Sequence, residues 1–259
     1  MGNAKCDLMD FSFLLLVRID SRERQENLAA VITYLLTNFN TQIHLIECDS
    51  ISRINFQIPS EISYDFIKDD NKILHTTRYR NHLIKNCKTT NFFIYDVDVV
   101  ISKEQIKEAA TLIRENKNSL VYPYDGKFFN VSGIFRNLFI KTYAIQILES
   151  NVECLTLLFP NSIGAVFGAS KSFYIICGLE NEHLYGWGPD DKERFQRVAK
   201  LEYQIFRTKG LLFHLDHPRG INSHFPPGVV ANKNYQEYLR IVTSSRDQLI
   251  NYINTWNWL

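Results

Sequence analysis

Apolar positions along this chain form short continuous runs that alternate with helical stripes. Residues 13–17 are an unbroken apolar run, as expected of a strand covered on both faces. The next apolar positions share one side of a helix, at Leu28, Val31, Ile32, Leu35 and Leu36. The alternation continues with expected strands at 42–47, 91–95, 120–122, 165–167 and 211–215, and expected helices at 77–87, 103–116, 136–148, 171–177 and 190–203. This order predicts an α/β fold with a mostly parallel central sheet flanked by helices.

The pattern shows no repeat, low-complexity segment or linker. With 259 residues, 45% of them hydrophobic, the chain can bury a sizeable core. We therefore expect a single domain over 1–259, with a core at about 11–230 and an amphipathic helical tail at about 231–259. Tyr252, Trp256 and Trp258 in this tail could dock on a membrane or an acceptor, but helical spacing favours packing onto the protein's own body.

Composition narrows the class of protein. The net charge is +1, from 29 basic and 28 acidic residues, which argues against a nucleic-acid partner. The five cysteines lack the spacing of a zinc site, which indicates buried thiols of a reducing compartment. The longest apolar stretch near the start is too short to cross a bilayer. We expect a cytoplasmic protein, at most peripherally attached to the inner face of the cell membrane.

Two acidic residues follow the buried-looking strand 91–95. Asp96 and Asp98 are separated by one residue, so in an extended chain both carboxylates face one site. Oxygen ligands of this kind suit Mg²⁺ or Mn²⁺. His214 and His217, beside a later strand end, could complete a metal site with Asp98. The alternative is that strand-end aspartates cap loops and that the histidines are ordinary hydrogen-bonded residues.

The most specific string is Tyr-Gly-Trp-Gly-Pro-Asp-Asp-Lys-Glu at 185–193. Glycines on both sides of Trp187 allow a tight turn that leaves the indole free to stack on a sugar face. Asp190 and Asp191 open a predicted helix, where carboxylates are also favoured simply by the helix dipole. Helix capping explains the aspartates but not the glycines and the tryptophan.

Cationic side chains follow the first strand and begin a later helix. Arginine matches phosphate oxygens, so this group could contact the base or phosphates of a nucleotide. The alternative is a solvated helix start with Arg–Glu pairs along the helix, and we favour that interpretation for Arg24. The cations are Arg18, Arg22 and Arg24, with Arg78 and Arg80 further on, and Asp20 lies among the first three.

Taken in order, segments 22–26, 96–98, 185–191 and 214–217 resemble the GT-A glycosyltransferases of the beta-1,4-galactosyltransferase-like group and their bacterial polysaccharide-synthesising relatives. Residues 164–171 are similar to the Gly-rich strand that precedes the tryptophan motif in that family. The resemblance covers about residues 13–220. It departs at Pro189, where a small residue is usual, and at Asp190, where Glu is usual.

The resemblance implies a role for each matching residue. Asp98, His217 and His214 would bind Mn²⁺ or Mg²⁺, and Asp96 would face the nucleotide. Asp191 would be the catalytic base, and Asp190 would hold the sugar or the acceptor. The donor site would be lined by Arg18, Asp20, Arg22, Arg78, Gly164 and Trp187.

The activity implied is inverting transfer of a hexose or N-acetylhexosamine, galactose or N-acetylgalactosamine favoured, from a UDP-sugar to a glycan or lipid-linked glycan acceptor. The setting implied is bacterial surface or capsular polysaccharide synthesis. Two alternatives stay open. A haloacid dehalogenase-type phosphatase also places an aspartate pair after an apolar strand, and a non-catalytic UDP-sugar-binding protein could keep the same fold.

Overall fold

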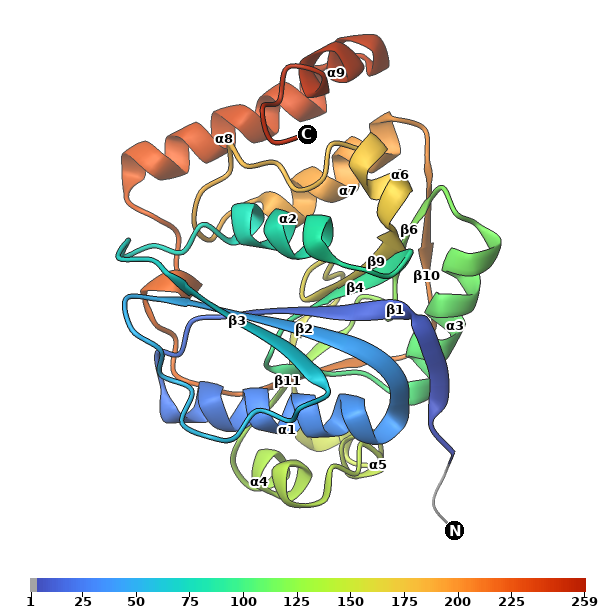
Figure 1. The fold of residues 1–259 in the computed structure, drawn as a ribbon, viewed down its shortest axis with the longest axis vertical. Helices are drawn as coiled ribbons and strands as arrows, with labels where there is room; N and C mark the ends of the chain where they lie inside the picture. Colours follow the sequence, from blue (N-terminus) through green and yellow to red (C-terminus); the bar gives the residue numbers. More distant parts are fainter. Residues whose placement is uncertain (1–3) are drawn as a thin grey trace.

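The computed structural model describes residues 4–259 and has an α/β architecture with two sheets (Figure 1). Residues 1–3 of the expected domain lie outside the described part. The larger sheet has seven strands in the order β10-β6-β9-β4-β1-β2-β3. These are β1 (Cys6–Val17), β2 (Phe39–Asp49), β3 (Ile62–Lys68), β4 (Asn91–Tyr95), β6 (Ser119–Tyr122), β9 (Val166–Ser170) and β10 (Gln204–Arg207). Strand β9 is antiparallel to β4 and β6, whereas the other pairs are parallel, so the predicted mostly parallel sheet is confirmed.

A smaller sheet of four strands has the order β5-β11-β7-β8. Its strands are β5 (Val99–Val100), β7 (Phe128–Val131), β8 (Thr156–Phe159) and β11 (Leu212–Leu215). The sequence did not predict β3, β5, β7, β8 or β10. Strand β8 is largely exposed and β3 mixes exposed and buried positions, so neither has the apolar run that marks the central strands.

The helices differ from expectation mainly at their ends. Helices α1 and α2 cover opposite faces of the β1–β3 part of the sheet (Figure 1). The helix expected at 136–148 is two, because the chain turns at Tyr143, whose φ of 54° lies in the left-handed region. The helices are α1 (Arg22–Asn38), α2 (Thr76–Asn86), α3 (Lys103–Glu115), α4 (Gly133–Thr142), α5 (Gln146–Glu149), α6 (Lys171–Ile176), α7 (Asp190–Lys200), α8 (Gly228–Thr243) and α9 (Arg246–Ile253), with single turns η1 (Val152–Cys154) and η2 (Ile221–Ser223).

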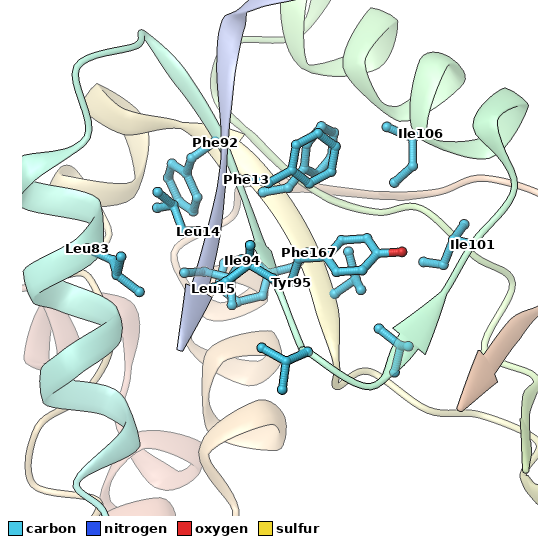
Figure 2. Packing of buried hydrophobic residues seen from close by; sticks show 14 of the residues in the cluster. Phe13, Leu14, Leu15, Leu83, Phe92, Ile94, Tyr95, Ile101, Ile106 and Phe167 are labelled. Carbon is cyan, nitrogen blue, oxygen red and sulfur yellow. The ribbon is translucent and has the colours of Figure 1, made fainter. Parts of the chain in front are cut away.

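The core is built on both faces of β1. Phe13 packs against the ring of Tyr95 from β4, with centroids 5.6 Å apart. Figure 2 shows Leu83 of α2 on one side of β1 and Ile106 of α3 on the other. Each such side chain contributes about 1.5–3 kcal/mol when it is fully buried. The prediction of a strand covered on both faces is confirmed.

The aromatic tail packs onto the protein itself. Trp256 and Trp258 are only 4% and 8% exposed, and the indole N–H of Trp258 donates to the carbonyl of Gly178 at 3.2 Å. Docking of these two rings on a membrane or an acceptor is therefore excluded. The expected helical tail consists of two helices that are divided at Ser244, and Ser245 caps α9 through a reciprocal hydrogen-bond pair with Gln248.

Within residues 4–259, no helix combines the length and apolar character needed to cross a bilayer. All five cysteines are free thiols in this part of the chain. Cys48, Cys87 and Cys177 are buried as expected, but Cys154 is exposed and Cys6 is half-buried.

Candidate active site

Asp98, His214 and His217 meet where the two sheets join. Asp98 lies in the turn between β4 and β5, and β5 pairs antiparallel with β11, which carries His214. The N–H of Leu215 donates to the carbonyl of Asp98 at 2.7 Å and closes this arrangement. One ligand atom from each of the three side chains lies within 4.8 Å of the others. The residues expected to bind a metal are therefore brought together, with His214 in the strand expected at 211–215 and His217 in the segment after it.

The hydrogen bonds of the two imidazoles differ. His214 Nδ1 lies 2.9 Å from Asn130 Oδ1, and Asn130 uses its amide nitrogen on Asp216 at 3.2 Å. Since the amide oxygen accepts, Nδ1 of His214 carries the hydrogen and its Nε2 keeps a lone pair for a metal. His217 Nδ1 lies 2.8 Å from the carbonyl oxygen of Pro218, and its Nε2 lies 3.0 Å from Asp98, a contact that a bound ion would replace. Two imidazole nitrogens and a carboxylate fit a divalent transition-metal ion such as Mn²⁺.

The surroundings favour an ionised carboxylate in this group. Burial alone would raise the pKa of Asp98, but the hydrogen bond from His217 and nearby cationic groups, including Arg24, hold that pKa well below its usual range. Burial lowers the pKa of His214. Burial also acts to lower the pKa of His217, yet its contact with Asp98, at 3.0 Å, raises it overall.

Arg24 reaches into this group, and the interpretation of it as part of an Arg–Glu pair along the helix is wrong. Its NH1 atom lies 3.3 Å from Asp98 Oδ2, and its NH2 atom lies 3.2 Å from His217 Nε2. Its Nε atom donates to Asp20 at 2.9 Å. The Arg–Glu pair is formed instead by Arg22, with Glu26 at 2.8 Å. The reason is helical geometry: residues two apart point to different sides of α1.

The extended-chain argument predicted that Asp96 and Asp98 face one site. In the structure the two carboxylates have different partners. The strand ends at Tyr95, and the turn at 97–98 sends Asp98 towards His217. Asp96 pairs with Arg80 NH2 at 3.1 Å instead. Burial raises the pKa of Asp96 to about 6, Arg80 opposes this, and the charges of Asp98 and Asp191 add to it, so the carboxylates lie within electrostatic reach of each other.

Asp190 and Asp191 at the start of α7 bind buried arginines. Asp190 lies 3.3 Å from Arg80 NH1, and Asp191 Oδ1 lies 2.8 Å from Arg194 NH1. Neither carboxylate caps the helix, whose N-cap Pro189 has no side-chain hydrogen bond. Burial and the charge of Asp191 raise the pKa of Asp190 to about 7, in spite of Arg80.

Asp191 is the more open of the two. Its side chain is 34% exposed, against 14% for Asp190. Its second oxygen lies over Gly164, so close that a Cβ on this glycine would be 2.3 Å from Oδ2. The carbonyl of Gly164 accepts a hydrogen bond of 2.8 Å from the Tyr124 hydroxyl, which holds the glycine in place. Asp191 therefore has one oxygen held and one oxygen free.

The tryptophan loop is shaped from behind by α8. Asn234 is 2% exposed; it accepts from the N–H of Tyr185 at 3.1 Å and donates to the carbonyl of Tyr185 at 2.8 Å. Gly186 has a φ of 74°, a conformation that favours glycine. Trp187 is 42% exposed and contacts Phe225 edge to face at 4.5 Å. Asn234 could not be predicted from the sequence, since a polar residue on an amphipathic helix is expected to be exposed.

The remaining predicted donor residues are not part of this group. Arg18 is engaged by the protein, through the carbonyls of Cys48 and Asn71 at 2.7 Å each and Asp69 at 2.9 Å. The Arg22 side chain is 88% exposed. Arg78 is exposed and lines a separate hollow of about 600 Å³ with residues 67–71, Tyr79 and His82. Donor contacts by Arg18, Arg22 and Arg78 remain predictions.

Known proteins provide an independent comparison. No protein family model matches the chain. Beta-1,4-galactosyltransferase 7 of Mus musculus is 21% identical over 201 residues, which cover 76% of this chain and 47% of that protein. The crystal structure of GalNAc-T7 with UDP, GalNAc and Mn²⁺ matches with a TM-score of 0.57 at 12% identity, over 94% of this chain and 50% of that one. The protein has a GT-A fold. The expected fold class is thereby confirmed.

This GT-A chain spans about half the length of each of the two proteins that it matches. The structural match covers 94% of this chain. The fold therefore gives no support to the haloacid dehalogenase alternative.

Proposed function

We propose that this protein is an inverting, metal-dependent glycosyltransferase. It transfers a hexose or N-acetylhexosamine, with galactose or N-acetylgalactosamine favoured, from a UDP-sugar to a hydroxyl of a glycan acceptor. The observation that carries the proposal is Asp191, a carboxylate with one oxygen on Arg194 and the other open over Gly164. The names of the two similar proteins, a galactosyltransferase and a GalNAc-transferase crystallised with UDP and Mn²⁺, support it.

Asp98, His214 and His217 would hold Mn²⁺ or Mg²⁺ through one carboxylate oxygen and one ring nitrogen of each histidine. Such an ion, when bound, acts as a Lewis acid and template that neutralises the charge on a diphosphate. Asp96 would face the nucleotide ribose, and Trp187 would line the donor and acceptor positions. Asp190 would hold the sugar or the acceptor.

Asp191 acts as general base in the proposed reaction. Its free oxygen takes the proton of the acceptor hydroxyl while the hydroxyl oxygen forms a bond to the anomeric carbon. The bond from that carbon to the diphosphate oxygen breaks, and its electron pair leaves with UDP. A single displacement of this kind inverts the anomeric centre, through a transition state that resembles an oxocarbenium ion. General base catalysis contributes about 10²- to 10⁴-fold in rate.

The proposed setting is synthesis of bacterial surface or capsular polysaccharide on the cytoplasmic side of the membrane, with a glycan or lipid-linked glycan as acceptor. This part of the proposal rests on the sequence resemblance. Assays with lipid-linked and free glycans as acceptors would test it directly.

The deciding experiment measures UDP release from a panel of UDP-sugars, with Mn²⁺ and with EDTA. We expect slow, metal-dependent hydrolysis of one sugar, and faster release when its acceptor is present. Asp191→Asn should reduce turnover by about 10²-fold or more and leave UDP binding nearly intact. Asp247→Asn is the matched control, since Asp247 also lies in the first turn of a helix but is exposed.

The alternatives give different results. Metal-dependent UDP binding without turnover on any acceptor would favour the non-catalytic UDP-sugar-binding protein. Phosphate release from an aryl phosphate would support a phosphatase. If Asp191→Asn loses both UDP binding and turnover, Asp191 is a structural residue.

A further inference from the structure

Arg194 is a buried cation that contacts two carboxylates, those of Glu180 and Asp191. Its side chain is 0% exposed, on the inner side of α7. Its Nε and NH2 atoms lie 2.8 and 2.9 Å from the two oxygens of Glu180. Its remaining NH1 atom lies 2.8 Å from Asp191 Oδ1. The planar guanidinium therefore joins a buried carboxylate to the open one.

The far end of this arrangement is rigid. Glu180 accepts a short hydrogen bond from the Tyr174 hydroxyl, and its own N–H donates to Asn81 Oδ1 at 2.7 Å. The guanidinium carbon of Arg194 lies 4.1 Å from the centre of the Phe167 ring, which adds a cation–π contact. Since both sides of the guanidinium are held, its third nitrogen points in one direction.

This direction sets the orientation of the Asp191 carboxylate. Oδ1 is bound by Arg194, and the other oxygen, Oδ2, lies over Gly164. Without the arginine the plane of the carboxylate could rotate, and the oxygen over Gly164 would no longer be held in one position. Positioning of a base to within a fraction of an ångström is worth large factors in rate, since a misplacement of about 1 Å can cost 10²-fold.

We propose that Arg194, held by Glu180, is the positioning residue that orients Asp191 for proton abstraction. The proposal rests on the proposed function of Asp191. Arg194 does not touch the substrate in this role and acts only through Asp191. The titratable groups that face Asp191 are Asp190 and Arg194 of α7, Asp96 after β4, Tyr122 in β6 and Tyr124 in the loop after it.

The chain offers a matched control in the same helix. Arg197 is also 0% exposed and pairs with Glu193 at 2.7 Å, and it donates to the carbonyls of Cys177 and Leu179. Its hydrogen-bond partners in the described part of the chain are Glu193, Cys177 and Leu179, and Asp191 is not among them. Arg194→Lys and Arg197→Lys each keep the charge and lose the planar fork, so both should lower the melting temperature to a similar extent.

The experiment compares these two variants in kinetics. Arg194→Lys should lower kcat by about 10- to 100-fold with little change in UDP affinity. Arg197→Lys should keep kcat close to the wild-type value. Equal losses of kcat in both variants, in proportion to their stability, would overturn the proposal.

A second measurement does not depend on activity. Protein labelled with ¹³C at the aspartate carboxyls is studied by NMR at one fixed pH, and the Asp191 signal is identified from its absence in Asp191→Asn. Arg194→Lys should change the chemical shift of this signal, because the carboxylate loses its hydrogen bond to the guanidinium, and Arg197→Lys should leave it in place. The double variant Arg194→Met with Glu180→Gln removes both buried charges together and guards against misfolding. An unmoved Asp191 signal in both Arg194 variants overturns the positioning role even if the enzyme is active, whereas absent turnover in the wild type overturns the proposed function.

Discussion

His214 Nδ1 lies 2.9 Å from Asn130 Oδ1, and this contact turns the other ring nitrogen towards Asp98 and His217. Asn130 comes from β7 and His214 from the neighbouring strand β11, and the two residues are paired in register. The side-chain amide of Asn130 is oriented in turn by Asp216. A hydrogen-bond partner outside the ligand set thus selects the tautomer that can bind a metal.

Replacing Asn130 should therefore weaken metal binding without removing a ligand. Asn130→Ala frees the His214 ring to rotate and to exchange tautomers, and we expect about 10- to 100-fold lower Mn²⁺ affinity. Titration of free Mn²⁺ by electron paramagnetic resonance measures this affinity directly. Asn116→Ala, at the C-terminal end of α3, is the control. Unchanged affinity in Asn130→Ala would show that the hydrogen bond is not needed for ligation.

Arg24 should oppose metal binding in the free protein. Its guanidinium lies within 3.3 Å of Asp98 and 3.2 Å of His217, so a divalent ion bound there is repelled by a neighbouring positive charge. Without nucleotide, Arg24→Gln should bind Mn²⁺ about 3- to 10-fold more tightly. Calorimetry in the absence of UDP tests this, with Arg114→Gln on α3 as control. Weaker binding would mean that Arg24 stabilises the ligand geometry more than it repels the ion.

A side chain at position 164 should impair catalysis, although the backbone of Gly164 does not lie in the left-handed region and could accept another residue. A Cβ would lie 2.3 Å from Asp191 Oδ2, and Asp191 cannot move away without leaving Arg194. We expect Gly164→Ala to lower kcat by about 10- to 100-fold while the protein stays folded. Gly228→Ala is the control, since a Cβ there meets nothing within 4 Å. Normal kcat in Gly164→Ala would argue that the position of Oδ2 is not important for the reaction.

Asp190 should make the protein less stable as the pH rises. Its pKa is 3.8 in its usual surroundings and about 7 in the fold, so between these values the folded state holds a proton that the unfolded state loses. Stability conferred by this group is therefore lost as the pH rises from about 4 to 7. Asp190→Asn should match the wild type near pH 4 and exceed it at pH 8 by roughly 4 kcal/mol in free energy of unfolding, the difference that a pKa of about 7 in place of 3.8 implies.

Urea unfolding at both pH values measures this difference, with Asp247→Asn as the control for loss of a first-turn carboxylate. A variant that is less stable than the wild type at pH 8 would contradict the prediction. It would mean that Asp190 contributes more through its pair with Arg80, at 3.3 Å, than it loses through burial.

The sequence predicted the parts of the site that follow buried strands. Asp98 and His214 could be found because each comes at the end of an apolar run, and Asp191 because an unusual glycine–tryptophan string precedes it. Asn130 could not be found, because β7 is a four-residue strand with only alternate positions buried. Short strands of this kind depend on tertiary pairing more than on local pattern.

The buried arginines are the other part of the site that the sequence did not predict. Arg194 looks like any polar helix residue, and only its contact with Glu180, fourteen positions earlier, makes burial of its charge possible. Arg80 was noted in sequence only as a neighbour of Arg78, yet Arg80 lies in the site and Arg78 is exposed. A sequence pattern shows which side of a helix is apolar but not which charges will find partners inside.

The two hydrogen bonds between Asn234 and Tyr185 join residues 49 positions apart and make the C-terminal helices a support for the tryptophan loop. Helix α8 lies beside the segment between α6 and α7 that carries this loop, and the last tryptophans of the chain are buried (Figure 1). A protein cut near residue 230 would keep every residue proposed for metal binding and proton transfer. It would nevertheless leave Trp187 on an unsupported segment, so shortening at the far end of the chain would be felt first in how an acceptor is held.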